Sequence, residues 1–113
     1  MNYKLLPMMF FIFLIMSGNV FSASGTVMIT SPVDGATVSS GDRVKLSYEV
    51  VPGPEGDHLH LIIDDKRVGP LRQLKGTAEI DSLAPGKHQI CITVNNKGHI
   101  PIGIEGCVNV TSK

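Results

Sequence analysis

The chain has 113 residues, and its ten Lys and Arg residues balance ten Asp and Glu residues, so the net charge with neutral His is zero. A chain of this length forms one domain. Because the charge is balanced and the basic residues are scattered, the composition argues against a nucleic-acid partner and against an anionic membrane surface.

The first segment has the pattern of a signal peptide. Lys4 precedes an apolar run from Leu5 to Met16. This run has about a dozen residues, whereas a membrane-spanning helix needs roughly 20. Val20 and Ser22 supply the small residues that precede a cleavage site.

These features predict cleavage after Ser22, with cleavage after Ser24 as the second choice and an uncleaved N-terminal anchor as the alternative. We therefore expect a signal peptide over residues 1–22 and a single mature domain over residues 23–113. The mature domain is expected in the periplasm or outside the cell, without stable membrane insertion after cleavage.

The mature chain reads as short strands separated by turns, without a convincing helical period. The segment 43–50 alternates apolar residues with polar ones, as a half-buried strand does. Further strands are expected over residues 26–30, 58–64, 77–83, 88–94 and 107–112, with a short "ATV" strand within 31–42 and a short edge strand within 65–76. Loops are expected over 52–57 and 95–106.

Short strands with frequent turns predict an all-β fold, an immunoglobulin-like antiparallel β-sandwich of about seven strands. The core would be aliphatic. Its expected members are Val44, Leu46, Val50, Leu59, Leu61, Ile63, Ile80, Leu83, Ile90, Ile92, Val94, Val108 and Val110.

Two cysteines lie on the polar faces of their strands. Cys91 alternates with Ile90 and Ile92, and Cys107 precedes Val108 in "CVNVTS". If the two strands pair antiparallel with Cys91 opposite Cys107, the sulfur atoms meet in a non-hydrogen-bonded pair. An exported protein with two cysteines favours this disulfide. A free thiol pair and a set of soft metal ligands are the alternatives.

The stretch "GDHLHLIIDD" places two histidines at the start of a strand. Residues two apart in a strand point the same way, so His58 and His60 share one face and stand close enough to chelate one ion. Imidazole suits copper and zinc. The site would be completed by His88 and His99, and the candidate carboxylates are Asp57, Asp64 and Asp65. In the alternative interpretation, the histidines bind no metal and are surface side chains on a solvated strand face, in a turn and in a loop.

The loop "GHIPIGIEG", residues 98–106, is the candidate surface for a protein or polysaccharide partner. Ile100 and Ile102 would form its apolar patch, and the alternative is that these isoleucines cap the core. No nucleophile elbow and no phosphate-cradling glycine loop is found. We therefore do not expect an enzyme.

Several motifs together resemble a known family. "SPVDGATV", "GDHLHLIID", "LAPGKHQICITV", "GHIP" and a final "VNVTS" occur in this order. The run is similar to the small exported bacterial domains known as "domain of unknown function 4399". The resemblance implies an immunoglobulin-like sandwich. It matches that family's histidine motifs to His58 and His60, to His88, and to His99 with Pro101.

A looser similarity joins "SPVDGATV" and "GHIPIG" to the CopC-like periplasmic copper proteins, which are also immunoglobulin-like sandwiches. Both resemblances imply that a transition metal, copper or zinc, binds to the domain. Such a site needs three or four of the histidines to converge at one end of a sheet.

Overall fold

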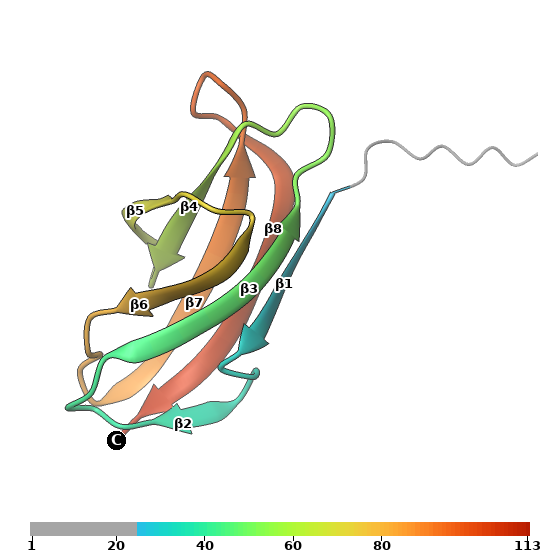
Figure 1. The fold of residues 1–113 in the computed structure, drawn as a ribbon. Helices are drawn as coiled ribbons and strands as arrows, with labels where there is room; N and C mark the ends of the chain where they lie inside the picture. Colours follow the sequence, from blue (N-terminus) through green and yellow to red (C-terminus); the bar gives the residue numbers. More distant parts are fainter. Residues whose placement is uncertain (1–24) are drawn as a thin grey trace, which may run out of the picture.

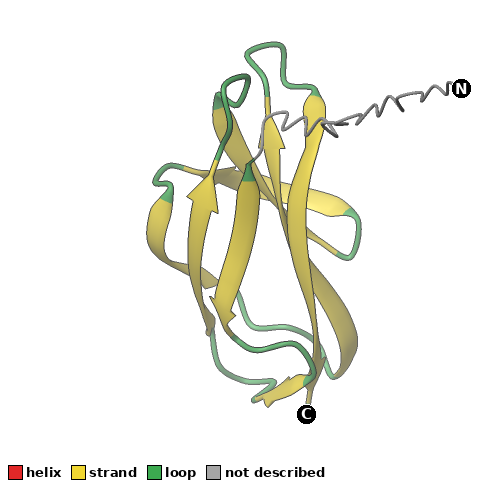
Figure 2. Ribbon diagram, turned by 90° about the vertical axis from the view of Figure 1, so that its right-hand side faces the viewer, coloured by secondary structure: helices red, strands yellow, loops and turns green. Residues whose placement is uncertain are grey.

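A computed structural model describes residues 25–113, so the expected signal peptide and its cleavage sites lie outside the described residues. The described part of the chain forms eight strands and no helix, arranged as two packed sheets (Figures 1 and 2). The strands are β1 (Thr26–Ser31), β2 (Ala36–Val38), β3 (Val44–Val51), β4 (His58–Ile63), β5 (Lys66–Leu71), β6 (Lys75–Ile80), β7 (Gly86–Asn95) and β8 (Pro101–Ser112). Residues 25–113 therefore contain no helix that could cross a membrane. The predicted all-β sandwich is confirmed.

The strands form a three-stranded sheet in the order β1-β3-β6 and a five-stranded sheet in the order β2-β8-β7-β4-β5. Every pairing is antiparallel except that of β2 with β8, which is parallel. The expected sandwich was antiparallel throughout. The short β2 can run parallel to β8 because the two strands are far apart in the sequence and no hairpin turn joins them in an antiparallel direction.

The core lies between the two sheets and follows the alternation of the strands. Of the thirteen expected core residues, twelve are buried, and Ile63 is partly buried against the others. The structure adds Tyr48 and Leu71 to the core. The Tyr48 hydroxyl donates a hydrogen bond of 2.9 Å to the carbonyl of Gln73, which satisfies its polar end.

The strand β8 begins earlier than the sequence pattern predicts. Its first residue, Pro101, pairs with Asn95 of β7, so the expected loop over 95–106 shrinks to residues 96–100. β2 covers only Val110 to Ser112 of β8, which leaves the beginning of β8 at a sheet edge. An edge position tolerates proline and glycine. Pro101 and Gly103 therefore lie in a strand although their residue types are typical of a loop.

The turn between β4 and β5 consists of Asp64 and Asp65. Both residues have positive φ, 51° and 69°. Two positive-φ residues are what a type I′ hairpin turn requires. The strand therefore ends at Ile63 rather than at residue 64, and the two aspartates serve the turn.

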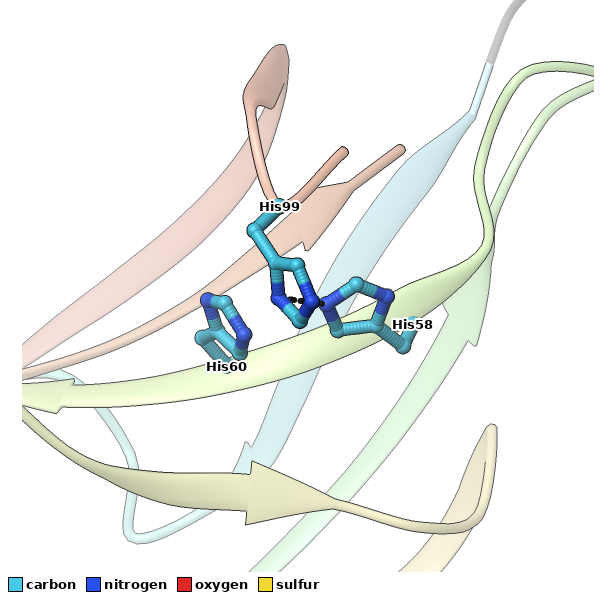
Figure 3. Close-up of side chains that lie close together, drawn as sticks. All are labelled: His58, His60 and His99. Carbon is cyan, nitrogen blue, oxygen red and sulfur yellow. Dashed lines mark hydrogen bonds between the residues drawn. The ribbon is translucent and has the colours of Figure 1, made fainter. Parts of the chain in front are cut away.

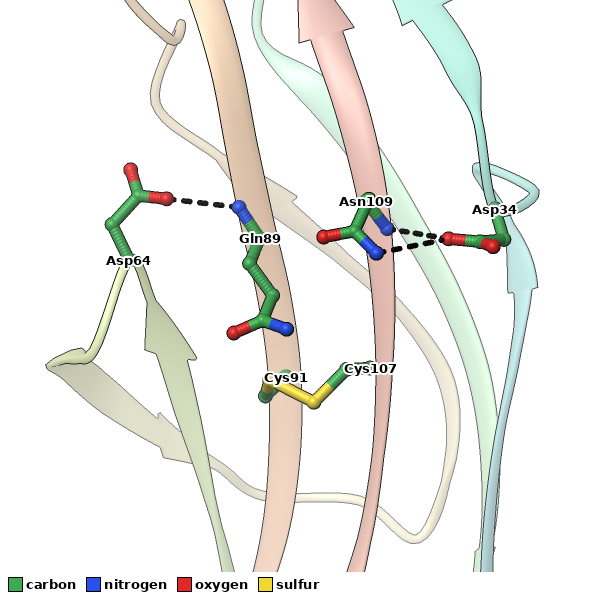
Figure 4. The surroundings of a disulfide bond; sticks show 6 residues. All are labelled: Asp34, Asp64, Gln89, Cys91, Cys107 and Asn109. Carbon is green, nitrogen blue, oxygen red and sulfur yellow. Dashed lines mark hydrogen bonds between the residues drawn. A yellow bond between two sulfur atoms is a disulfide. The ribbon is translucent and has the colours of Figure 1, made fainter.

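The disulfide between Cys91 and Cys107 is confirmed. The two residues face each other in the β7–β8 ladder with Cα atoms 4.0 Å apart. The bond lies on the outer face of the five-stranded sheet, between the positions of Asp64 and Asp34 on its flanks (Figure 4). Residues 25–113 contain no free cysteine. The alternatives of a free thiol pair and of a set of soft metal ligands are therefore excluded for Cys91 and Cys107.

Candidate metal centre

Three of the four histidines meet at the end of the sandwich where β4 begins. His58 and His60 come from β4, and His99 reaches over them from the β7–β8 loop (Figure 3). One ring nitrogen of each lies within 4.8 Å of those of the other two. The ring centroid of His58 is 4.8 Å from that of His60 and 4.6 Å from that of His99.

The alternation of β4 explains why two of these histidines share a face. Leu59 and Leu61 point into the core, which turns His58 and His60 outward. His60 is nevertheless only 5% exposed. It lies opposite Pro70 of β5 and Thr93 of β7, so neighbouring strands flank it on both sides.

The imidazole of His60 is available as a ligand. Its ring nitrogens make no hydrogen bond with any residue in the range 25–113. No buried side-chain nitrogen in this range lacks a partner, so the ring nitrogens of His60 keep some contact with solvent although the residue is only 5% exposed. Burial lowers the pKa of His60, and the positive charges of Arg67, His58 and His99 lower this pKa further. The ring is therefore neutral near pH 7 and keeps a lone pair for a metal ion.

His99 is held in place by a hydrogen-bonded turn. Its N–H donates to the carbonyl of Asn96 at 2.9 Å. The Asn96 side-chain oxygen accepts hydrogen bonds from the backbone N–H groups of Gly98, at 2.8 Å, and Ile100, at 3.1 Å. His99 itself has a φ of 64°, in the left-handed region. The loop thus fixes the direction in which the imidazole projects.

His58 is oriented by Asp57. A carboxylate accepts hydrogen bonds only, so Nδ1 of His58 carries the proton that it donates to Asp57 over 3.1 Å. The other nitrogen, Nε2, then keeps its lone pair and accepts a hydrogen bond of 3.1 Å from Nδ1 of His99, a bond that a metal ion would replace. A carboxylate that orients a histidine in this way is typical of metal sites.

His88 does not join this group, which corrects the expectation that all four histidines contribute. It lies on β7 five residues from Thr93, the residue opposite His60, so about 17 Å of strand separate the two. Both nitrogens of its ring are engaged, Nδ1 with Asp64 at 2.6 Å and Nε2 with the carbonyl of Ala84 at 2.7 Å.

The expected carboxylates divide in the same way. Asp57 contacts the cluster through His58. Asp64 accepts hydrogen bonds from His88 and from the backbone N–H of Gln89, and Asp65 completes the turn beside it. Neither Asp64 nor Asp65 lies in the group of residues that could hold a metal ion. Both aspartates lie in the turn that follows β4, at the other end of this strand from His58.

Sequence reasoning overlooked the organising role of Asn96. The signal was present in "NKGH", because an asparagine two residues before a glycine is typical of a turn in which its side chain binds the following backbone. Such a turn at residue 96 would have placed His99 at a defined position rather than in a loose loop.

The donor set fits a transition metal. Metal–nitrogen bonds are roughly 2.0–2.1 Å long, which places nitrogen ligands of a tetrahedral ion about 3.3 Å apart. Nε2 of His58 and Nδ1 of His99 are already 3.1 Å apart. The nitrogen of His60 lies within 4.8 Å of the other two, so its ring would have to move inward to complete a set of three nitrogen donors. Such a set suits zinc and copper(II).

The candidate partner residues differ in exposure. Ile100, the last residue of the β7–β8 loop, is 59% exposed. Ile102 and Ile104 lie in β8 and pack partly against the core. The apolar surface of this loop is therefore formed by Ile100, whereas Ile102 contributes to packing.

Comparison with solved structures supports the fold. A CbhA fibronectin(III)-like module of Clostridium thermocellum matches with a TM-score of 0.65 and 21% identity, over 78% of this chain and 96% of that chain. The CARDB domain of a Pyrococcus furiosus protein, in complex with di-metal ions, matches with a TM-score of 0.59 and 14% identity, over 83% and 97%. An extracellular domain of a one-component-system protein from B. thetaiotaomicron gives 0.55 and 12%, over 80% of this chain and 16% of that one.

No family model matches the sequence. A search of curated proteins also finds no match. Neither resemblance drawn from the motifs is confirmed by these comparisons. The fibronectin III-like and CARDB neighbours place the fold among small immunoglobulin-like modules.

Proposed function

We propose that this domain is a metal-binding module that takes copper(II) or zinc at His58, His60 and His99. The observation that carries the proposal is the convergence of three imidazoles from two separate elements. The ring nitrogens of His60 make no hydrogen bond within residues 25–113, and His58 is oriented by a carboxylate.

The donor atoms favour these ions over copper(I). Soft copper(I) prefers thiolate and thioether sulfur. Within residues 25–113 both cysteines are joined in the disulfide, and Met28, on β1 of the other sheet, is the one methionine. Three nitrogen donors suit zinc and copper(II) instead.

Export of the domain belongs to the same proposal. A disulfide between neighbouring strands persists in an oxidising compartment, such as the periplasm or the extracellular medium. The expected signal peptide over residues 1–22 would direct the chain there. Mass determination of the mature protein tests this point, with a start at Ala23 as the expected result.

The binding experiment is calorimetric titration of residues 23–113, with the disulfide formed, by Cu(II) and by Zn(II). The parent is expected to bind one ion with micromolar or tighter affinity. The variants His58→Ala/His60→Ala and His99→Ala are expected to lose this binding, whereas His88→Gln should retain it. Absence of binding by the parent, or an equal loss in His88→Gln, would contradict the proposal.

A second candidate function is a module that binds a protein or polysaccharide partner through the 98–106 loop. The favouring observation is the exposure of Ile100 beside His99. Capture of a partner should then be lost in Ile100→Ser. A variant of the packed neighbour, Ile102→Ser, should instead lower stability. Capture that survives Ile100→Ser would count against this function.

A further inference from the structure

The candidate metal centre offers three protein donors. Within residues 25–113, the group of His, Cys, Asp and Glu side chains that could hold one ion contains His58, His60 and His99 alone. The nearest carboxylate, that of Asp57, is bound to Nδ1 of His58. A four-coordinate ion held by three protein ligands takes its fourth ligand from outside the site.

The open position faces solvent. His60 forms the floor of the cluster at 5% exposure, the His58 side chain is 24% exposed, and His99 is an exposed residue. A ligand can therefore reach the ion from solution.

The positive charge of Arg67 favours an anion at the fourth coordination position. Arg67 lies on β5 opposite Ile62, the next outward-facing residue of β4 after His60. Ile62 is two residues from His60, and neighbouring strands lie about 4.8 Å apart, so Arg67 is a diagonal neighbour of His60 on this face. Among residues 25–113, no acidic side chain forms an ion pair with Arg67, so its charge is not neutralised by a partner.

Two carboxylates lie near the cluster, that of Asp57, which accepts a hydrogen bond from His58, and that of Glu105. Glu105 lies opposite Thr93, which places it two strands from His60 across the sheet. Neighbouring strands are about 4.8 Å apart, so the separation across these strands is about 10 Å. Three neutral imidazoles add no negative charge to a divalent ion, so the ion beside Asp57 would keep a net positive charge, to which Arg67 adds.

We propose that the metal-loaded centre binds a small anion at its fourth coordination position and that Arg67 strengthens this binding. The inference rests on the proposed metal-binding function. Arg67 acts here as a positioning charge, through its field, while the metal ion makes the bond to the anion.

The test uses the Cu(II)-loaded domain with azide as the anionic probe and imidazole as a neutral probe. Azide is expected to produce an azide-to-copper charge-transfer band that saturates with one anion per metal ion. Arg67→Gln should weaken azide binding by about twofold to threefold at low ionic strength, the size expected for unit charges roughly 8–10 Å apart. Imidazole binding should be unchanged in this variant.

Lys87→Gln is the matched control. Lys87 lies on the same sheet and faces the same way as Thr93, but it is six residues before Thr93 on β7. The substitution therefore removes one positive charge far from the cluster. It should leave azide binding unchanged.

The outcomes separate the two proposals. If the domain takes up no metal, the proposed function fails before azide is added. If copper binds but azide gives no band, the open position is wrong. An equal effect of Arg67→Gln and Lys87→Gln would overturn the role of Arg67. A dimer formed on copper loading, seen by sedimentation, would show that a second copy supplies the fourth ligand, which also overturns the anion proposal.

Discussion

Among single residues, Asp57 has the clearest influence on the centre without being one of its three ligands. Its carboxylate accepts the hydrogen bond from Nδ1 of His58 and so fixes which nitrogen faces the ion. A partner of this kind raises the basicity of the ligand and restrains its ring.

Replacement of Asp57 therefore weakens metal binding without removing a ligand. Asp57→Ala is expected to lower the Zn(II) affinity by about 10- to 100-fold, the usual effect of losing such a partner. Competition with a chromophoric chelator measures the dissociation constant. The control is Asp81→Ala, which removes an exposed aspartate that pairs with Arg43. An unchanged affinity in Asp57→Ala would show that the carboxylate does not orient His58 in the loaded site.

The His88–Asp64 pair links stability to pH. The hydrogen bond from His88, followed by that from the Gln89 N–H, lowers the pKa of Asp64. The hydrogen bond to Asp64, followed by that to the Ala84 carbonyl, raises the pKa of His88. The contribution of Asp64 is lost as the pH falls through its lowered pKa. The contribution of His88 is complete below its ordinary pKa of 6.5 and is lost as the pH rises through its raised pKa.

The pair is therefore expected to stabilise the fold most between about pH 4 and pH 6.5, where Asp64 is ionised and His88 is protonated. Because the pair is near the surface, its contribution is on the order of 0.2–1 kcal/mol. Between pH 6 and pH 9 the metal-free parent should lose a few degrees of Tm, about 1–5 °C, relative to His88→Gln. Calorimetry in a chelating buffer measures both proteins. Parallel Tm curves for the two would refute the linkage.

At the scale of elements, the β7–β8 hairpin presents His99 and is closed by the disulfide. The bond spans 16 positions in the sequence and lies on the exposed face of the sheet, away from the core contacts of Ile90 and Ile92. It therefore acts on the whole chain through the unfolded state more than through packing.

Removal of the disulfide should lower stability and spare the metal site. Cys91→Ala/Cys107→Ala is expected to lower the free energy of unfolding by about 3 kcal/mol, the chain-entropy value for a loop of roughly 15 residues. Guanidinium titration measures the loss. In the fraction that remains folded, Zn(II) affinity should change by less than about threefold, since the Asn96 turn and not the disulfide fixes His99. A tenfold loss of affinity in the folded variant would contradict this division of roles.

Much of this arrangement follows from local alternation in the sequence. Alternation set the inward face of β3 and the shared face of His58 and His60, and the parity of Cys91 and Cys107 indicated their pairing. Alternation does not reveal the register between distant strands. Because β4 pairs with β7 so that His60 faces Thr93, His99 comes near the cluster and His88 lies far from it. That register depends on the packing of the whole sandwich, which no local pattern records.

The start of β8 illustrates the same limit. Pro101 and Gly103 suggested a loop, because both residues weaken strands in a sheet interior. Proline and glycine are tolerated there because, among residues 25–113, no strand is hydrogen-bonded to that side of the first part of β8, since β2 pairs only with its last residues. The sheet edge is a property of the complete topology.

At the scale of the whole molecule, the candidate centre joins parts of the chain that are 41 residues apart, His58 on β4 and His99 on the β7–β8 loop. The core beneath it contains Leu59 and Val94, both almost fully buried. A metal ion bound at this point requires β4 and the hairpin to be in their native register, so it binds the folded state in preference to the unfolded chain.

Metal binding is therefore expected to stabilise the entire domain. At free Zn(II) one hundred times the dissociation constant, the gain is about 2.7 kcal/mol, which for a domain of this size corresponds to a rise in Tm of about 10–20 °C. Thermal unfolding with and without Zn(II) measures the shift, and chelation should reverse it. His99→Ala should abolish the shift, because the remaining pair on β4 closes no loop between distant elements, whereas His88→Gln should keep it. A Tm that rises equally in His99→Ala would mean that the ion binds to β4 alone and that the hairpin takes no part in the site.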